Sequence, residues 1–136
     1  MLPLVLDTNI VLDAYVFADE AARPLRAQLD AGHWRWLATA AMREELRRVL
    51  DYPQLAPRLA FHGLQSTDVL LHFDSRTSVV DTAPKAPVTC KDPDDQKFID
   101  LAVAHGALLL SKDRAVTSMR KRLALHGVVA ATVLPA

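Results

Sequence analysis

The chain has 136 residues, of which 51% are apolar, and its 16 lysines and arginines balance its 16 aspartates and glutamates. This length and composition fit one folded domain with a sizeable core and exclude a disordered chain. A net charge near zero excludes binding to nucleic acid through bulk positive charge, so any such contact must depend on local patches or on a metal ion.

The sequence offers no disulfide framework and no membrane segment. Cys90 is its only cysteine, which also excludes a cysteine-rich zinc site. The N-terminal apolar run over residues 2–6 ends at Asp7 and is too short for a secretion signal. No stretch approaches the roughly 18 apolar residues that a membrane span needs. We therefore expect a cytoplasmic protein.

Short apolar runs alternate with segments of helical periodicity along the whole chain. Thr39 can cap one of these helices, Pro53 marks the break after it, and Gly106 can end a later one. In chain order the pattern predicts strand 4–6, helices 10–17 and 20–31, strand 33–37, helices 39–50, 54–61 and 65–73, strand 77–80, helix 94–105, strand 107–110, helix 115–125 and strand 128–134.

This order of elements predicts an α/β fold. Five strands separated mostly by helices favour a largely parallel sheet with right-handed crossovers. The proline-containing stretch 81–93 is predicted to be a loop. Because the sequence contains no internal repeat, low-complexity segment or linker, residues 1–136 are expected to form a single domain.

Two aspartates follow buried strands. Asp7 comes directly after the first strand, and Asp113 comes shortly after the strand that ends at Leu110. In an open parallel sheet, ligands bind outside the carboxyl ends of the strands. The two carboxylates can therefore face one crevice.

Two further acids lie on the apolar faces of predicted helices. Glu45 stands three residues after Met42 and four before Val49, whereas Glu44 shares a solvent-facing side with arginines. Asp95 aligns with Phe98 and with the apolar residues that follow it, and Asp94 aligns less well. Helical phase thus selects Glu45 over Glu44 and Asp95 over Asp94.

Together, Asp7, Glu45, Asp95 and Asp113 predict a metal site. Singly, each aspartate has an ordinary alternative as a helix cap, a dipole partner or a turn residue. Four acids aimed at one edge are harder to explain structurally, because unpaired charges are rarely buried. Mg²⁺ and Mn²⁺ prefer oxygen ligands, and such an ion can activate water for attack on a phosphodiester.

The motifs around these acids resemble those of the PIN-domain ribonucleases, and in particular of the PIN-family toxins of bacterial toxin–antitoxin pairs. Residues 5–9 read VLDTN, like the first motif of the family, and residues 45–50 read ELRRVL, like its helical glutamate motif. Residues 90–98 read CKDPDDQKF, similar to the third motif of the toxin-like subgroup. Residues 111–113 read SKD, like the closing Ser/Thr-x-Asp motif.

The resemblance implies a three-layer α/β/α fold with a five-stranded, mostly parallel sheet. It also implies dependence on Mg²⁺ or Mn²⁺, endonucleolytic cleavage of RNA, a homodimer, and inhibition by a cognate antitoxin protein. It gives Thr8 and Asn9 supporting roles at the site, and Ser111 is a candidate to orient Asp113 or a water. Asp92 and Asp94 are further acids beside Asp95, so the exact ligand in this motif stays open.

Two other functions compete with this hypothesis. A phosphatase of the haloacid-dehalogenase type also begins with an aspartate after a buried strand, but it needs a second acid two residues later, where this chain has Asn9. A PIN domain that only binds RNA, or serves as a scaffold without turnover, is the other alternative. Such a domain has no need for four clustered carboxylates.

Several other side chains could contact RNA or fill the core. Trp34 and Trp36 share one face of their predicted strand, and we favour core or dimer packing over base stacking. For Lys112 and Arg114, which flank Asp113, contact with phosphate and an ordinary surface position are equally favoured.

Overall fold

All five strands of the central sheet run parallel, in the order β3-β2-β1-β4-β5. The computed structural model describes residues 1–135. The prediction of a largely parallel five-stranded sheet is therefore confirmed. The strands are β1 (Leu2–Leu6), β2 (Trp34–Ala38), β3 (Thr77–Val79), β4 (Leu108–Leu110) and β5 (Ala130–Ala131).

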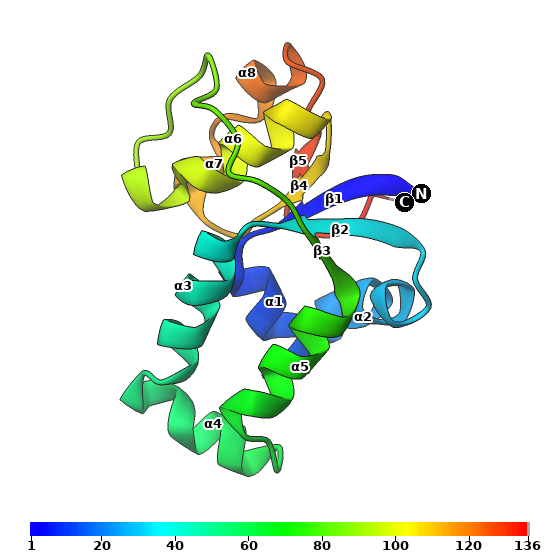
Figure 1. Cartoon of the computed structure of the whole chain (residues 1–136), viewed down its shortest axis with the longest axis vertical. Helices are drawn as coiled ribbons and strands as arrows, with labels where there is room; N and C mark the ends of the chain where they lie inside the picture. The colour runs from blue at the N-terminus through cyan, green and yellow to red at the C-terminus, as the bar shows by residue number, and fades with distance from the viewer. Residues whose placement is uncertain (136) are drawn as a thin grey trace.

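Helices cover both faces of this sheet, which gives the expected three layers (Figure 1). Helices α1 and α2 lie against one face, and α3, α4 and α5 continue that layer away from the sheet. Helices α6, α7 and α8 lie on the other side. The α-helices are α1 (Thr8–Tyr15), α2 (Arg23–Asp30), α3 (Ala40–Leu50), α4 (Ala56–Phe61), α5 (Ser66–Arg76), α6 (Gln96–His105), α7 (Arg114–Thr117) and α8 (Arg120–Ala124).

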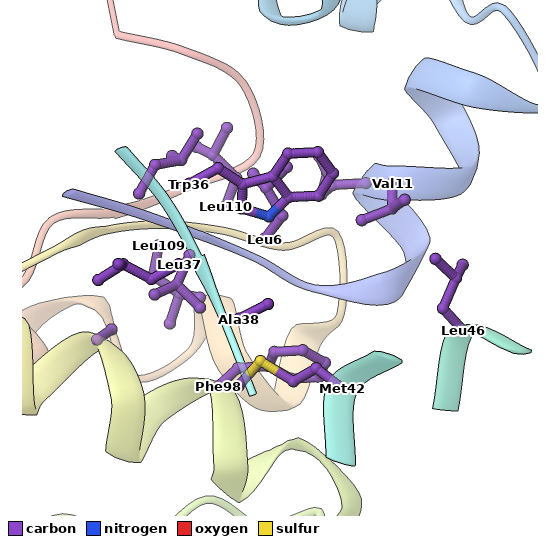
Figure 2. Close-up of a cluster of buried hydrophobic side chains, with 14 of the residues drawn as sticks. Leu6, Val11, Trp36, Leu37, Ala38, Met42, Leu46, Phe98, Leu109 and Leu110 are labelled. Carbon is purple, nitrogen blue, oxygen red and sulfur yellow. The ribbon is translucent and has the colours of Figure 1, made fainter. Parts of the chain in front are cut away.

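The core fills both sides of the sheet because neighbouring side chains on each strand point to opposite faces. Figure 2 shows this for Trp36 and Leu37 on β2 and for Leu109 and Leu110 on β4. All four side chains are buried. Strands that are buried on both faces require the continuous apolar runs seen in the sequence.

The indole of Trp36 is the largest of the fully buried side chains. It stacks on Tyr15 of α1 with ring centroids 6.2 Å apart and meets Phe73 of α5 edge-on at 5.3 Å. Trp34, at the start of the same strand, is only half-buried and donates a hydrogen bond from Nε1 to Gln28 at 2.7 Å. Core packing is therefore confirmed for Trp36.

The order of the strands places β1 and β4 at the point where the chain reverses direction across the sheet. The chain runs outward from β1 to β2 and β3, then returns to the other side of β1 as β4. In parallel α/β sheets, the crevice outside the strand ends at such a point is where ligands bind. The register pairs Leu6 with Leu110, so Asp7 and Ser111 leave the sheet side by side.

Two predicted helix ends are confirmed. The Thr39 side chain accepts a hydrogen bond from the Met42 amide at 3.4 Å at the start of α3. Gly106 has a φ of 59° after the last residue of α6, a left-handed conformation that glycine adopts without strain.

Some predicted boundaries were wrong, and each difference has a local cause. The helix predicted over 115–125 is divided into α7 and α8 by a turn at Ser118 and Met119, where the Ser118 hydroxyl donates to the Ala115 carbonyl at 3.4 Å. The strand predicted over 128–134 shrinks to Ala130–Ala131, because its partner β4 has only three residues.

Other boundaries differ by one to three residues, as for the helices predicted over 10–17 and 65–73, and short 3₁₀ turns precede three helices. The turns η1 (Glu20–Ala22), η2 (Pro53–Leu55) and η3 (Pro93–Asp95) precede α2, α4 and α6. Pro53 and Pro93 begin η2 and η3, and proline suits such a first turn because it has no N–H to leave unsatisfied. No helix within residues 1–135 is long and apolar enough to cross a membrane.

Trp36→Ala should lower the free energy of unfolding by about 3–5 kcal/mol, the usual cost of truncating a buried aromatic side chain. Trp34→Ala should cost clearly less, since that indole is half-buried. Urea unfolding followed by circular dichroism measures both values. Equal losses in the two variants would contradict the assignment of Trp36 as the centre of this core.

Candidate metal centre

Asp7 and Ser111 begin the site at the carboxyl ends of β1 and β4. The Asp7 amide donates to the Leu110 carbonyl at 2.9 Å, which continues the sheet pairing by one step. The Ser111 hydroxyl, which is completely buried, then donates to Oδ2 of Asp7 at 2.7 Å. Asp7 is 5% exposed and, within residues 1–135, its side chain makes no cap to α1. Its carboxylate therefore stays aimed along the end of the sheet.

Ser111 also connects Asp7 to Asp113. The Asp113 amide donates to the Ser111 hydroxyl oxygen at 3.0 Å, so one buried hydroxyl serves both aspartates. Asp113 caps α7 by accepting from the Ala115 amide at 2.9 Å through Oδ1. The capping interpretation of Asp113 is thus correct, and it leaves the second oxygen of the carboxylate for other partners. The predicted orienting role of Ser111 has direct contacts to support it.

Asp92, Asp95 and Asp113 form the tightest group of carboxylates. One oxygen from each lies within 4.8 Å of the others. Asp92 caps η3 by accepting from the Asp94 amide at 2.9 Å, which places it at the mouth of the group. Asp95 is 7% exposed, whereas Asp94 is exposed. Helical phase therefore selected the buried member of this pair.

Asp95 has a buried oxygen without a hydrogen-bond partner. Within residues 1–135, Oδ2 of Asp95 is the one buried side-chain oxygen or nitrogen in this condition. Its carboxylate does not cap α6 in the part of the chain that the structure describes, so capping does not explain its burial. A buried acceptor that lacks a partner costs about 1–3 kcal/mol, more if charged. A proton, a hydrogen-bond donor or a cation would satisfy this oxygen.

The electrostatics of the site show the same need. Burial, followed by the hydrogen bond that its protonated carboxyl can make with Asp113 and by the negative charges of Asp7, Asp113 and Asp92, raises the pKa of Asp95 to about 8. The pKa of Asp7 is also raised, first by burial and then by the charges of Glu45 and Asp113, although the Ser111 hydrogen bond opposes this. The four acids selected from the sequence therefore act on one another.

Glu45 lies at the edge of this cluster and has two partners. The Thr8 hydroxyl donates to its Oε2, and Lys97 Nζ lies 2.8 Å from its Oε1. Lys97 also donates to the carbonyl of Asp94. Glu45 is therefore held from both sides, by Thr8 at the start of α1 and by Lys97 on α6.

Two residues near the site carried no signal in the sequence. Lys97 stands 52 positions from Glu45, and no spacing rule links them. Asp13 is buried on α1 and forms an ion pair with Lys112 at 2.6 Å, so the Lys112 ammonium is already bound.

Asn9 links the segments that follow β1 and β4. Its Oδ1 accepts a hydrogen bond from the amide of Lys112 at 3.3 Å.

The donors in this group suit a hard divalent cation. Carboxylate oxygens are the ligands that Mg²⁺ and Mn²⁺ prefer, and the partnerless Oδ2 of Asp95 supplies the buried atom that such an ion would satisfy. The acids that fit this role most directly are Asp92, Asp95 and Asp113, with Asp7 joined to them through Ser111. Glu45 differs from these acids in that Lys97 already forms an ion pair with it.

A parallel α/β domain with clustered carboxylates at its topological switch point defines the class of this protein. Residues 3–115 match the family model of the PIN domain, and the chain belongs to this family. No curated protein matches the chain. Among solved structures, a chain in the crystal structure of VapBC2 from Rickettsia felis bound to a DNA fragment from their promoter is similar in fold. The TM-score is 0.62 at 14% identity, over 95% of this chain and 97% of that chain.

Without a metal ion, the stability of the wild-type chain should fall as the pH rises. The folded state holds the Asp95 proton until a pH of about 8, whereas the unfolded state releases it near its ordinary value of 3.8. Stability is therefore lost between these two pH values. Asp95→Asn, which mimics the protonated form, should flatten this decline. Part of the decline should remain in this variant, because the pKa of Asp7 is also raised. Urea unfolding in EDTA at pH 5 and pH 8 measures the slope.

The matched control is Asp94→Asn, which removes the neighbouring exposed carboxylate. It should keep the wild-type dependence on pH. Because the lowered pKa of His72 has the opposite effect, the comparison between variants decides: an Asp95→Asn chain that keeps the wild-type slope would show that Asp95 does not hold a proton in the folded state.

Proposed function

We propose that this protein is a metal-dependent endoribonuclease that hydrolyses RNA phosphodiesters and acts as the toxin of a toxin–antitoxin pair. The observation that carries the proposal is the buried, partnerless Oδ2 of Asp95 within a group of three carboxylates. Such a group is unfavourable in an empty site and favourable around a cation. Membership of the PIN domain family and the four motifs support the same activity.

Asp7, Asp95 and Asp113 are the proposed metal ligands, with Glu45 holding the ion directly or through water. When bound, Mg²⁺ or Mn²⁺ supplies a water of lowered pKa and neutralises the charge that develops on the phosphodiester. No protein nucleophile is then needed. The chain's own contribution is to hold the carboxylates in place before substrate arrives.

Three polar side chains support these ligands. Ser111 fixes the orientation of Asp7 and the position of Asp113, and Thr8 orients Glu45. Asn9 joins the segments that follow β1 and β4. Hydrogen-bonding partners of this kind are worth about 10- to 100-fold in metal affinity or activity at other metal sites. Asp92 is a further candidate ligand, since it belongs to the same group as Asp95.

The biological part of the proposal depends on the resemblance to PIN-family toxins and on the fold shared with a chain of VapBC2. We infer a homodimer and an antitoxin protein that restrains the nuclease. An open reading frame for a small DNA-binding protein beside the gene would support the antitoxin.

The double variant Asp7→Asn plus Asp95→Asn should lose RNA cleavage by at least about 100-fold with Mg²⁺ or Mn²⁺, since loss of the supporting shell alone costs about 10- to 100-fold. The measurement is the rate of cleavage of a labelled single-stranded RNA. Glu44→Gln, on the solvent side of α3, is the matched control and should keep the wild-type rate. Cleavage by the double variant at the wild-type rate would overturn the proposed mechanism.

A PIN domain that binds RNA without turnover is the main alternative, and metal affinity separates it from the enzyme. A ligand that binds only the folded state at 100 times its Kd stabilises a protein by about 2.7 kcal/mol. Saturating Mn²⁺ should therefore raise the wild-type Tm by several degrees and leave the Tm of the double variant almost unchanged. A wild-type Tm that does not respond to Mn²⁺ would favour the scaffold.

A phosphatase of the haloacid-dehalogenase type is disfavoured by the position of Asn9. That chemistry needs an acid two residues after Asp7, and here the position holds an amide that accepts from the Lys112 backbone. Membership of the PIN domain family also argues against it.

A further inference from the structure

A groove opens directly beside the carboxylate cluster and continues along α3. Its volume is about 560 Å³, within the range of ordinary ligand sites. Glu45, Asp94 and Lys97 form the end next to the cluster. The rest of the lining comes from α3 and the residues just after it, namely Arg47, Arg48, Val49, Asp51 and Tyr52.

The side chains along this groove follow the turns of α3. Arg48 stands three residues after Glu45 and shares its side of α3. Tyr52 follows the end of the helix and borders the same groove. Arg48 lies about 4.5 Å from Glu45 along the helix axis. The groove thus presents first an acid at the edge of the metal site, then a cation, then an aromatic ring.

Most charges in the groove already have a partner. Arg47 binds Glu44 at 2.6 Å and Asp51 at 3.4 Å, and Lys97 binds Glu45 at 2.8 Å. Asp94 lies at the end next to the cluster, on the segment that leads into α6. Arg48 is exposed and forms no ion pair within residues 1–135. Its guanidinium is the charge in the middle of the groove that can bind an anion.

Tyr52 completes the arrangement. The residue is 47% exposed, so its side chain is accessible from the groove. It follows the end of α3 and borders the same groove as Arg48. An exposed aromatic face beside an available cation is the combination that binds unpaired bases and their phosphates.

We infer that this groove binds a single-stranded segment of the nucleic-acid substrate, with a backbone phosphate on Arg48 and an unpaired base on Tyr52. The inference rests on the proposed function for the position of the cleaved phosphodiester at the carboxylate cluster. It adds two binding residues outside the carboxylate cluster, Arg48 for a phosphate and Tyr52 for a base. It also explains how a chain of zero net charge contacts RNA, since one cation and one ring act locally.

The test measures binding separately from cleavage. A chain carrying Asp95→Asn, which does not cleave under the proposed function, is titrated into a fluorescent single-stranded oligoribonucleotide with Mn²⁺, and anisotropy gives Kd. Adding Arg48→Ala or Tyr52→Ala should raise Kd about fivefold or more, since stacking alone is worth about that much per base. Arg35→Ala and Phe61→Ala are the controls, because they remove an exposed cation and an exposed ring outside the groove.

Two readouts separate direct contact from a general loss of structure. Arg48→Ala should reduce the slope of log K against log salt by about 0.7, as expected for one phosphate contact on a single strand, and Arg48→Lys should restore it. Tyr52→Ala should weaken binding to the single strand but not to a fully paired duplex, whereas Tyr52→Phe should behave like the parent chain.

The outcomes for the two proposals are distinct. An unchanged Kd in both groove variants, or no binding by the Asp95→Asn chain, overturns the groove inference and leaves Arg48 and Tyr52 available to a protein partner. Failure of the wild-type chain to cleave RNA overturns the proposed function alone, since the binding measurement does not depend on cleavage.

Discussion

The parallel pairing of β1 with β4 is the interaction on which the site depends. Its register sets Leu6 beside Leu110 and therefore Asp7 beside Ser111. A shift by one residue would turn each of these side chains to the opposite face of the sheet. Leu4 and Val5 of β1 and Leu109 and Leu110 of β4 are buried, so apolar packing on both sides of these strands favours the observed register. The energy that fixes the register is hydrophobic, and the carboxylate cluster is positioned as a consequence.

The same arrangement makes the cluster unfavourable by itself. Burial and mutual repulsion raise the pKa of both Asp7 and Asp95, and one oxygen of Asp95 is buried without a partner. Under the proposed function, a bound cation would offset the free energy that holding these groups together costs. Hydrogen bonds with Ser111 restrain Asp7 and Asp113, and Glu45 is restrained by Thr8 and Lys97. These contacts keep the site ordered without a ligand.

Much of the fold could be predicted because periodicity reports burial directly. Continuous apolar runs identified the strands, and helical phase separated the inward acids Glu45 and Asp95 from their exposed neighbours Glu44 and Asp94. The boundaries failed where local chemistry competes with periodicity, as at the turn that divides α7 from α8. The tight group of Asp92 with Asp95 and Asp113 was only partly foreseen, because Asp92 has a supporting role in the sequence motif and lies on no helical face.

The sequence by itself determined which residues are apolar, which helices carry an acid on their inner side, and that two aspartates follow buried strands. These properties are local, since each depends on a few neighbouring positions. Only the tertiary structure decided that Ser111 bridges two aspartates, that Lys97 neutralises Glu45 across 52 positions, and that Arg48 and Tyr52 border a groove next to the site. Those contacts join segments far apart in the chain, and the packing of α3 and α6 around the ends of β1 and β4 brings them together.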